Sequence, residues 1–477
     1  MSLTQMTLTQ LAEGLSHGRF SSEELTRAYL ARIGELDGDI HSYLYINEEG
    51  ALREARASDL RRTKGECLGV LDGVPYSLKD NICVKGMLTT CSSRMLENYR
   101  PPYDATIYTR LAEQGAVLLG KTNLDEFAMG GSTETSAFGT TRNPLDLTRS
   151  PGGSSGGSAA SVAASLCAYS IGTDTGGSIR QPAAFCGIVS VKPTYGAISR
   201  YGMIAMASSM DQAGVLSKTV KDNALVTDLL LGADPHDGTC VAHPEQGRML
   251  SCKREARSLR IAVPFSMTEQ FSSPDVCRQV LRAARALEAE GATLVDVTLP
   301  QLSGALATYH MLSACEASSN LARFDGVRYG HRASEYGSLE ELICRSRTEG
   351  FGGEVKRRIL LGTLALSSGF SEEYYRRALR VRGSVRMDLL SILEGCDLIL
   401  CPTTPSVATV LGQHCDDPAE HYGGDAWTAI ANLAGLPALS VPFGTGENGL
   451  PVGVQLMGAP FTESLLYRVG ELLEVLR

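Results

Sequence analysis

The chain has 477 residues, of which 43% are hydrophobic, and its 44 basic and 53 acidic residues give a formal net charge of −9. This composition excludes a disordered chain and argues against a nucleic-acid-binding face, because no basic residues cluster densely. The 13 cysteines form no Cys-x-x-Cys pair, which is typical of reduced thiols in a cytoplasmic protein and not of a disulfide framework or metal site. The first residues lack the basic and apolar regions of a signal peptide, so we expect a cytoplasmic location and no membrane segment.

The pattern of elements predicts an α/β protein. Residues 1–65 are expected to be helical: Ser21 and Glu24 have the spacing of a capping box, and an apolar helical face follows. Beyond Lys79, helical stretches alternate with short β-rich runs, which predicts helices covering a mostly parallel sheet. Examples of these β-rich runs are 116–120, 187–192, 260–264, 293–297, 398–402 and 439–441.

The chain shows no linker, repeat or low-complexity segment. Its length alone would allow two or three domains. Without a dividing segment we expect a single domain over residues 1–477. Within it, the helical region 1–65 packs on a core that includes residues 66–220.

Lys79 is the first candidate for a catalytic residue. It ends an apolar, aromatic run at 74–78, and burial of its stem would lower its pKa and make it a neutral base. The alternative is an ordinary ion pair with Asp80 at a strand end. Spacing alone favours the ion pair, because such pairs greatly outnumber catalytic lysines.

Two short motifs match by coincidence. Residues 115–122 fit the P-loop pattern, but their centre reads as an apolar strand and a helix at 106–114 precedes them, so we interpret Gly115 as a helix C-cap. Residues 152–156 fit the G-x-S-x-G elbow, which would make Ser154 the nucleophile. That elbow follows a strand, whereas 143–151 is turn-rich and reads as a loop.

Two glycine-serine clusters, 152–158 and 173–178, flank an apolar small-residue run at 159–171. Flexible linkers share the composition of the clusters. A linker would not enclose a core segment, however, and the run between them reads as a buried helix leading into a strand. Such clusters can present hydroxyl and backbone N–H groups to a ligand.

The order and spacing of Lys79 in 73–80, the cluster at 152–158 and the segment 172–183 resemble the amidase signature family. The resemblance implies a fold with one large mixed sheet sandwiched between helices. It also implies a Ser–Ser–Lys triad, with Ser178 as the nucleophile, Ser154 as the bridging hydroxyl and Lys79 as the base. A neutral amine can take a proton through a hydroxyl because a hydroxyl both donates and accepts.

The resemblance implies two further backbone features around the triad. One is a cis peptide between Gly153 and Ser154. The other is an oxyanion hole made by the backbone N–H groups of Thr175, Gly176, Gly177 and Ser178, which suits the need for donors aimed at a tetrahedral oxygen.

Outer segments of the chain are similar to the glutaminase branch of this family: 125–134, 316–330, 355–362, 432–437 and 450–455. This similarity implies hydrolysis of glutamine within a heterotrimeric amidotransferase, whose partners are subunits B and C. The ammonia would convert Glu-tRNA(Gln), held mainly by the B subunit, to Gln-tRNA(Gln), with ATP and Mg²⁺ bound by the partner. We expect no cofactor and no metal in this chain.

Two alternatives remain open at this point. One is a self-sufficient amidase of the same family that acts on another small amide. The other is a binding protein that has lost catalysis, which the intact Lys79, Ser154 and Ser178 disfavour.

A pocket for free glutamine must hold an α-carboxylate and an α-ammonium. By the same resemblance, Arg358 binds the carboxylate with its planar fork and Asp425 accepts from the ammonium. Charge pattern alone would instead make Arg358 a solvated member of a basic run, and Asp425 could be the N-cap of a helix at 426–434. The remaining implied lining is Tyr309 with Met129, Gly130 and Gly131.

Overall fold

A single large sheet runs through the molecule. The computed structural model describes residues 2–250, 256–299, 301–413 and 423–477. Its strands are β1 (Tyr43–Ile46), β2 (Pro75–Lys79), β3 (Val117–Thr122), β4 (Tyr169–Asp174), β5 (Val189–Lys192), β6 (Gln212–Ser217), β7 (Arg260–Val263), β8 (Thr293–Asp296), β9 (Leu398–Pro402), β10 (Ala438–Thr445) and β11 (Pro451–Gly458). Among the described residues they form one sheet in the order β1-β3-β2-β4-β6-β5-β10-β11-β9-β7-β8.

The sheet is mixed, as the family resemblance implied, and the expectation of a mostly parallel sheet is wrong. The parallel pairs lie toward the two ends, at β3-β2-β4 and β9-β7-β8. Between them β4, β6, β5, β10, β11 and β9 pair antiparallel. The connection between β10 and β11 spans only 446–450, which is too short for the crossover that a parallel pair needs.

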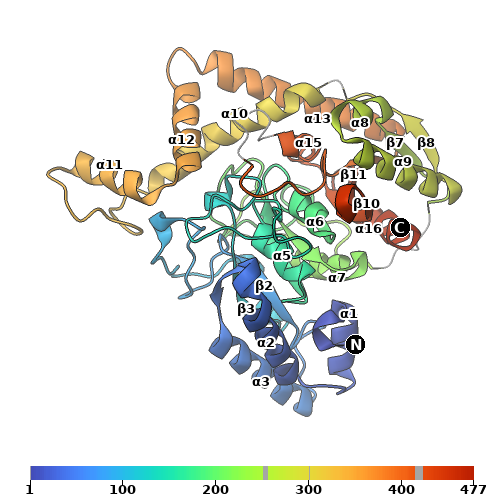
Figure 1. The fold of residues 1–477 in the computed structure, drawn as a ribbon, viewed down its shortest axis with the longest axis horizontal. Helices are drawn as coiled ribbons and strands as arrows, with labels where there is room; N and C mark the ends of the chain where they lie inside the picture. Colours follow the sequence, from blue (N-terminus) through green and yellow to red (C-terminus); the bar gives the residue numbers. More distant parts are fainter. Residues whose placement is uncertain (1, 251–255, 300, 414–422) are drawn as a thin grey trace.

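Helices cover both faces of this sheet (Figure 1). They are α1 (Leu8–Ser16), α2 (Ser22–Ile40), α3 (Glu48–Lys64), α4 (Thr106–Glu113), α5 (Gly156–Ala163), α6 (Arg180–Cys186), α7 (Val220–Leu230), α8 (Phe265–Phe271), α9 (Pro274–Ala289), α10 (Leu302–Asn320), α11 (Leu339–Gly350), α12 (Gly353–Leu366), α13 (Arg377–Gly395), α15 (Ala429–Ala434) and α16 (Glu463–Leu476). In Figure 1, α2 and α3 lie beside β2 and β3, whereas α10, α12 and α13 form a separate layer from which α11 projects.

Two local predictions about helix ends are confirmed. Ser21 accepts from the backbone N–H of Glu24 while the Glu24 side chain accepts from Ser21, so the capping box at the start of α2 is present. Gly115 follows the end of α4 with a φ of +74°, the left-handed conformation in which glycine commonly ends a helix. Strand β3 then begins directly, so the P-loop match is coincidental.

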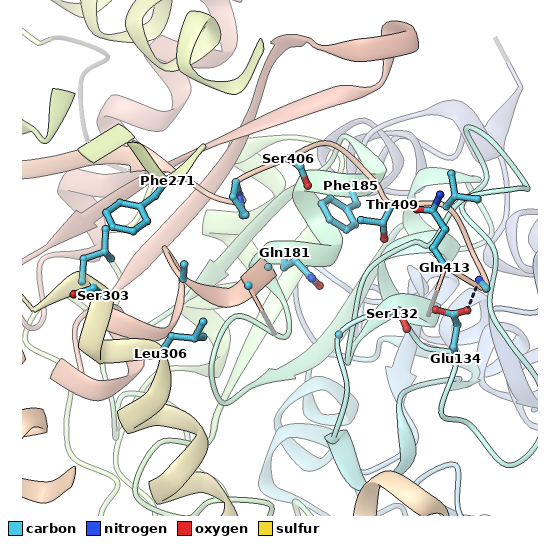
Figure 2. A pocket seen from close by; sticks show the side chains of 18 residues that line it. Ser132, Glu134, Gln181, Phe185, Phe271, Ser303, Leu306, Ser406, Thr409 and Gln413 are labelled. Atoms are coloured by element: carbon cyan, nitrogen blue, oxygen red, sulfur yellow. Dashed lines mark hydrogen bonds between the residues drawn. The ribbon is translucent and has the colours of Figure 1, made fainter. Parts of the chain in front are cut away.

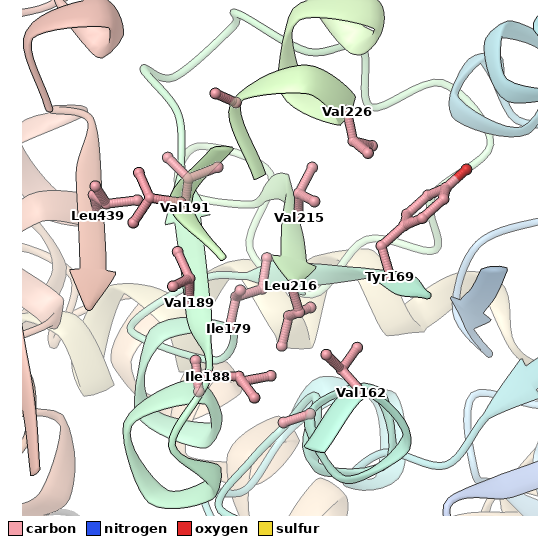
Figure 3. Close-up of a cluster of buried hydrophobic side chains, with 14 of the residues drawn as sticks. Val162, Tyr169, Ile179, Ile188, Val189, Val191, Val215, Leu216, Val226 and Leu439 are labelled. Carbon is pink, nitrogen blue, oxygen red and sulfur yellow. The ribbon is translucent and has the colours of Figure 1, made fainter. Parts of the chain in front are cut away.

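The core lies on the two faces of the central strands. Neighbouring residues of a strand point to opposite faces, and Figure 3 shows this on β6: Val215 lies toward Val226 of α7, and Leu216 lies toward Val162 of α5. The run predicted at 159–171 therefore divides into a buried helix, α5, and a buried strand, β4. These two elements position both glycine-serine clusters.

No helix in the described ranges is long and apolar enough to cross a membrane. Every cysteine that the structure describes is a free thiol.

Candidate active site

Three segments converge at one edge of the sheet. Strands β2 and β4 are parallel neighbours, with Leu78 opposite Ile171, so their carboxyl ends lie side by side. Lys79 is the last residue of β2, and the second glycine-serine cluster begins at the end of β4. The first cluster leads into α5, which packs on both strands. The fold thus brings together segments that lie far apart in the sequence.

Lys79 is fully buried at this junction. Its Nζ donates to Ser154 Oγ at 2.8 Å, to Ser155 Oγ at 2.8 Å and to the Thr173 carbonyl oxygen at 3.3 Å. The alternative interpretation, an ion pair with Asp80, is wrong. Asp80 Oδ1 instead forms a buried ion pair with Lys121 Nζ at 3.0 Å.

Ser155 is a site residue that sequence reasoning did not single out. Its hydroxyl donates to the Thr173 carbonyl at 3.1 Å, so toward Lys79 it can only accept. In the uncharged amine, the two N–H groups are then occupied by Ser155 and Thr173, and the lone pair faces Ser154. Ser155 stands in the glycine-serine motif, but adjacent serines give no sequence signal that separates an acceptor from a proton carrier.

Burial lowers the pKa of Lys79 from 10.5 to about 7, against the opposing charges of Asp125 and Asp174. A large share of Lys79 is therefore uncharged at neutral pH. An uncharged amine facing a hydroxyl is what a general base requires.

Ser178 lies in the turn between β4 and α6 and is 6% exposed. Its carbonyl accepts from the backbone N–H of Ser155 at 3.0 Å, which places it against the first cluster. The Gly153–Ser154 peptide is cis, as the resemblance implied.

Within the described ranges the Ser178 hydroxyl makes no hydrogen bond to a protein group. The structure thus forms the link from Lys79 to Ser154, while the link from Ser154 to Ser178 stays a prediction. Catalytic hydrogen bonds often tighten only when substrate binds.

The turn at 175–178 offers backbone donors beside Ser178. Across the described part of the chain, no protein group accepts from the N–H groups of Thr175, Gly176 and Ser178. The Gly177 N–H, in contrast, donates to Asp174 Oδ1 at 2.9 Å. The predicted oxyanion hole needs one correction in this conformation: Gly177 is occupied because the buried Asp174 carboxylate requires donors.

Asp174 itself is held by Arg180. The guanidinium Nε lies 3.0 Å from Asp174 Oδ2 in a fully buried ion pair, and Asn432 donates to the same carboxylate at 2.9 Å. Burial alone would raise the pKa of Asp174, but the Arg180 charge lowers it to about 2. Asp174 is therefore an ionised, fully hydrogen-bonded anchor for the turn that carries Ser178.

A small cavity next to this turn holds the predicted pocket residues. Tyr309, Arg358 and Asp425 line it together with the backbone of Gly130 and Gly131. Met129 is the exception: its side chain is fully buried in the apolar cluster around Phe127 and Phe351, so only the glycines after it reach the cavity. The prediction that Met129 lines the pocket is therefore wrong for its side chain.

The alternative interpretations of Arg358 as a solvated residue and of Asp425 as a helix N-cap are both wrong. Arg358 is only 5% exposed, so it is not a solvated member of the basic run; its Nε lies 2.7 Å from Glu354 Oε1. Asp425 does not cap a helix, because α15 begins at Ala429 with Thr428 as its N-cap. Desolvation raises the pKa of the Asp425 carboxyl to about 7. Both side chains thus line the cavity from buried positions, and Arg358 does so while it contacts Glu354.

Tyr309 closes one side of the cavity against the Ser178 turn. A methyl group at Gly176 would collide with the Tyr309 ring, so glycine at 176 is what allows the ring of α10 to approach the backbone donors. Tyr309 is 4% exposed, and it joins the pocket to the catalytic turn.

The cavity measures about 20 Å³, which is room for roughly one water. It adjoins a much wider cleft of about 920 Å³, and the two share Gly131, Gln181 and Gly424 as walls. Figure 2 shows this cleft, with Gln181 at its centre and Phe271, Ser303 and Leu306 on the opposite side from Ser132 and Glu134. A substrate that reaches Ser178 through the cleft passes Gln181.

Two groups with a pKa near 7 predict an unusual pH profile for hydrolysis of an α-amino-acid amide. In the free enzyme Lys79 must be uncharged and Asp425 ionised, and both conditions are lost below about pH 7. Below about pH 6, kcat/KM should therefore fall about 100-fold per pH unit. A bound ammonium keeps Asp425 ionised, so kcat should fall only about 10-fold per unit.

The measurement is initial rates from pH 5 to 9, with recovery of activity after return to pH 8 as the control for unfolding. A one-proton slope in kcat/KM down to pH 5 would contradict the assignment of both groups. In Asp425→Asn only Lys79 still titrates in this range, so kcat/KM should fall about 10-fold per pH unit on the acid side instead of about 100-fold.

Comparison with known proteins places the chain in context. The family model described as "Amidase" matches residues 24–467. The chain is 50% identical over 470 residues to the A subunit of a glutamyl-tRNA(Gln) amidotransferase from Synechococcus sp. (strain WH7803), covering 98% of this chain and 96% of the relative.

Two solved structures show the same fold. A crystal structure of the glutamyl-tRNA(Gln) amidotransferase A subunit from Thermotoga maritima matches with a TM-score of 0.81 at 38% identity, over 99% of this chain and 95% of that one. The peptide amidase of Stenotrophomonas maltophilia matches with a TM-score of 0.81 at 31% identity, over 99% and 96%.

Proposed function

The chain belongs to the amidase family, and from this premise we propose that it is the glutamine-hydrolysing A subunit of a glutamyl-tRNA(Gln) amidotransferase. The observation that carries the proposal is that a basic side chain, Arg358, and an acidic one, Asp425, line the same cavity beside the Ser178 turn. A free α-amino acid presents both an α-carboxylate and an α-ammonium, and this pair suits both. The names of the relatives support the same conclusion.

In the proposed reaction, Ser178 Oγ attacks the side-chain amide carbon of glutamine. The hydroxyl proton passes to Ser154, whose own proton passes to Lys79 Nζ. The carbonyl oxygen becomes an oxyanion held by the N–H groups of Thr175, Gly176 and Ser178. When the tetrahedral species collapses, the C–N bond breaks and Lys79 returns the proton through Ser154 to the leaving nitrogen, which departs as ammonia.

Water then releases glutamate from the acyl-enzyme. The same relay takes a proton from the water as its oxygen attacks the ester carbon, and returns it to Ser178 Oγ as the C–O bond breaks. The net change is glutamine plus water to glutamate plus ammonia. Lys79 ends the cycle uncharged.

We further propose that the ammonia serves partner subunits B and C in a heterotrimer. The B subunit would hold Glu-tRNA(Gln) and, with ATP and Mg²⁺, activate its glutamate for conversion to Gln-tRNA(Gln). This division of labour suits a chain with a net charge of −9 and no dense basic cluster.

The test is to purify the chain with its co-expressed partners and to measure glutamine hydrolysis with and without charged tRNA. The proposal expects hydrolysis to rise when partners and Glu-tRNA(Gln) are present. Full-rate hydrolysis by the isolated chain, indifferent to both, would instead favour a self-sufficient amidase.

Replacing Arg358 by alanine should raise the KM for glutamine about 30- to 100-fold and leave kcat within a few-fold. The reason is that a carboxylate loses a charge-assisted donor, worth about 2–3 kcal/mol. Arg357→Ala is the matched control, because Arg357 neighbours it and contacts the same Glu354, yet its side chain is 53% exposed. An unchanged KM in Arg358→Ala would remove this residue from the pocket.

A further inference from the structure

Gln181 occupies the boundary between the catalytic cavity and the outer cleft. It is the second residue of α6 and follows Ser178 by three positions. The side chain is 5% exposed and lines both the small cavity and the wide cleft. Figure 2 shows its amide end pointing into the space between the two walls of the cleft.

The oxygen of the Gln181 amide is committed to the loop that carries Ser154. Oε1 accepts from the backbone N–H of Gly153 at 2.8 Å. Because a backbone N–H can only donate, this contact fixes which end of the amide is the oxygen. Gln181 therefore helps to position the Gly152–Gly153 peptide, one residue before the cis peptide of Ser154.

The nitrogen of the same amide faces the cavity. A methyl carbon placed on Gly424 would lie 3.3 Å from Nε2, and one on Gly131 would lie 3.6 Å from it, so Nε2 sits between these two glycine walls. Within the described ranges no protein group accepts a hydrogen bond from Nε2. Its N–H donors are thus left for a ligand that lies between residues 131 and 424.

Only one group of an α-amino-acid substrate suits these donors. The α-ammonium carries donors itself and cannot accept, and the reacting carbonyl oxygen belongs with the backbone donors of the Ser178 turn. The α-carboxylate has about four acceptor positions. Arg358 does not meet all of them, because its Nε pairs with Glu354 and its Nη1 donates to Ser313 Oγ at 3.3 Å.

We propose that Gln181 is a specificity-determining residue that donates from Nε2 to the substrate α-carboxylate while its Oε1 accepts from the Gly153 N–H. The proposal rests on the proposed function, since it takes free glutamine as the substrate. One side chain then both binds the substrate carboxylate and positions the loop that carries Ser154. A substrate without that carboxylate loses the contact.

Two variants separate the two halves of the amide. Gln181→Glu keeps an acceptor for Gly153 and replaces the donor by a carboxylate oxygen, so at pH 8 the KM for glutamine should rise 10-fold or more with kcat within about three-fold. Gln181→Leu removes both contacts, so kcat should fall as well. Gln413→Glu is the matched control, because it adds the same charge to the outer cleft and lies outside the small cavity.

The decisive comparison uses glutaminamide, in which a neutral amide replaces the α-carboxylate. With the full chain in its co-expressed complex, Gln181→Glu should lose most of the wild-type preference for glutamine over glutaminamide. Glutamine binding to the same variant in a Ser178→Ala background, measured by calorimetry, should weaken by the same factor as KM rises.

Three outcomes would overturn the role of Gln181: an unchanged glutamine KM in Gln181→Glu, an equal loss for glutamine and glutaminamide, or an equal effect of Gln413→Glu. If any of these occurs while the wild-type complex hydrolyses glutamine, the role of Gln181 is rejected and the proposed function is retained. A wild-type complex that does not hydrolyse glutamine overturns both.

Discussion

Replacing Ser178 by alanine should lower glutamine hydrolysis by the assembled complex by about 10⁴-fold or more, because no acyl-enzyme can form without the Ser178 oxygen. The measurement is release of glutamate and ammonia under saturating glutamine. Ser178 is 6% exposed and its hydroxyl makes no hydrogen bond to a protein group among the described residues, so the loss should come without a change in melting temperature.

Added ammonium chloride supplies the control for this variant. If the chain only delivers ammonia, Ser178→Ala should still support amidation of Glu-tRNA(Gln) when ammonium replaces glutamine. Retention of glutamine hydrolysis in Ser178→Ala would show that another group is the nucleophile.

The second large effect is expected at Lys79. Lys79→Arg keeps a positive charge but cannot become neutral, so kcat should fall about 10³- to 10⁴-fold if Lys79 acts as a base. Lys79→Met removes the amine but keeps a side chain of similar length, and its kcat should fall as far as that of Lys79→Arg. If Lys79 only supplied a fixed charge, Lys79→Arg would retain activity and Lys79→Met would not.

Lys192 is the matched control for this experiment. It too is fully buried with its pKa lowered by burial to about 7, but its Nζ donates to the carbonyls of Pro193 and Leu436. Lys192→Met should therefore affect thermal stability and leave kcat of the folded enzyme within a few-fold. An equal loss of kcat in Lys192→Met and Lys79→Met would mean that buried charge, not base chemistry, explains the effect.

Local sequence predicted many elements well because periodicity and caps are short-range signals. The run ending at Lys79 is a strand, Gly115 ends a helix, and the predicted strand at 398–402 coincides with β9. The direction of strand pairing is set by chain connections and distant partners, which explains why the antiparallel centre was missed. Strands β1, β6 and β11 were not among the runs singled out from the sequence.

The candidate site, too, could be predicted only in part from the sequence. Motif order and spacing predicted Lys79, Ser154 and Ser178 through a family resemblance, whereas charge pattern alone favoured an ion pair for Lys79 and solvent for Arg358. Lys79 and Arg358 are both buried, contrary to what the local pattern predicted, because segments far away in the sequence form the environment of a side chain. Ser155 and Gln181 lay inside the motifs, but only hydrogen-bond directions in three dimensions distinguish their roles.

The central claim is that the hydroxyl of Ser178, activated by Lys79 through Ser154, forms a covalent bond with the substrate. The most direct test is to quench the wild-type complex during turnover of glutamine and to map the acylated peptide by mass spectrometry. The account predicts a glutamyl ester on Ser178 that is absent from Lys79→Met. An ester on Ser154 or Ser155, or turnover with no acylated serine, would contradict it.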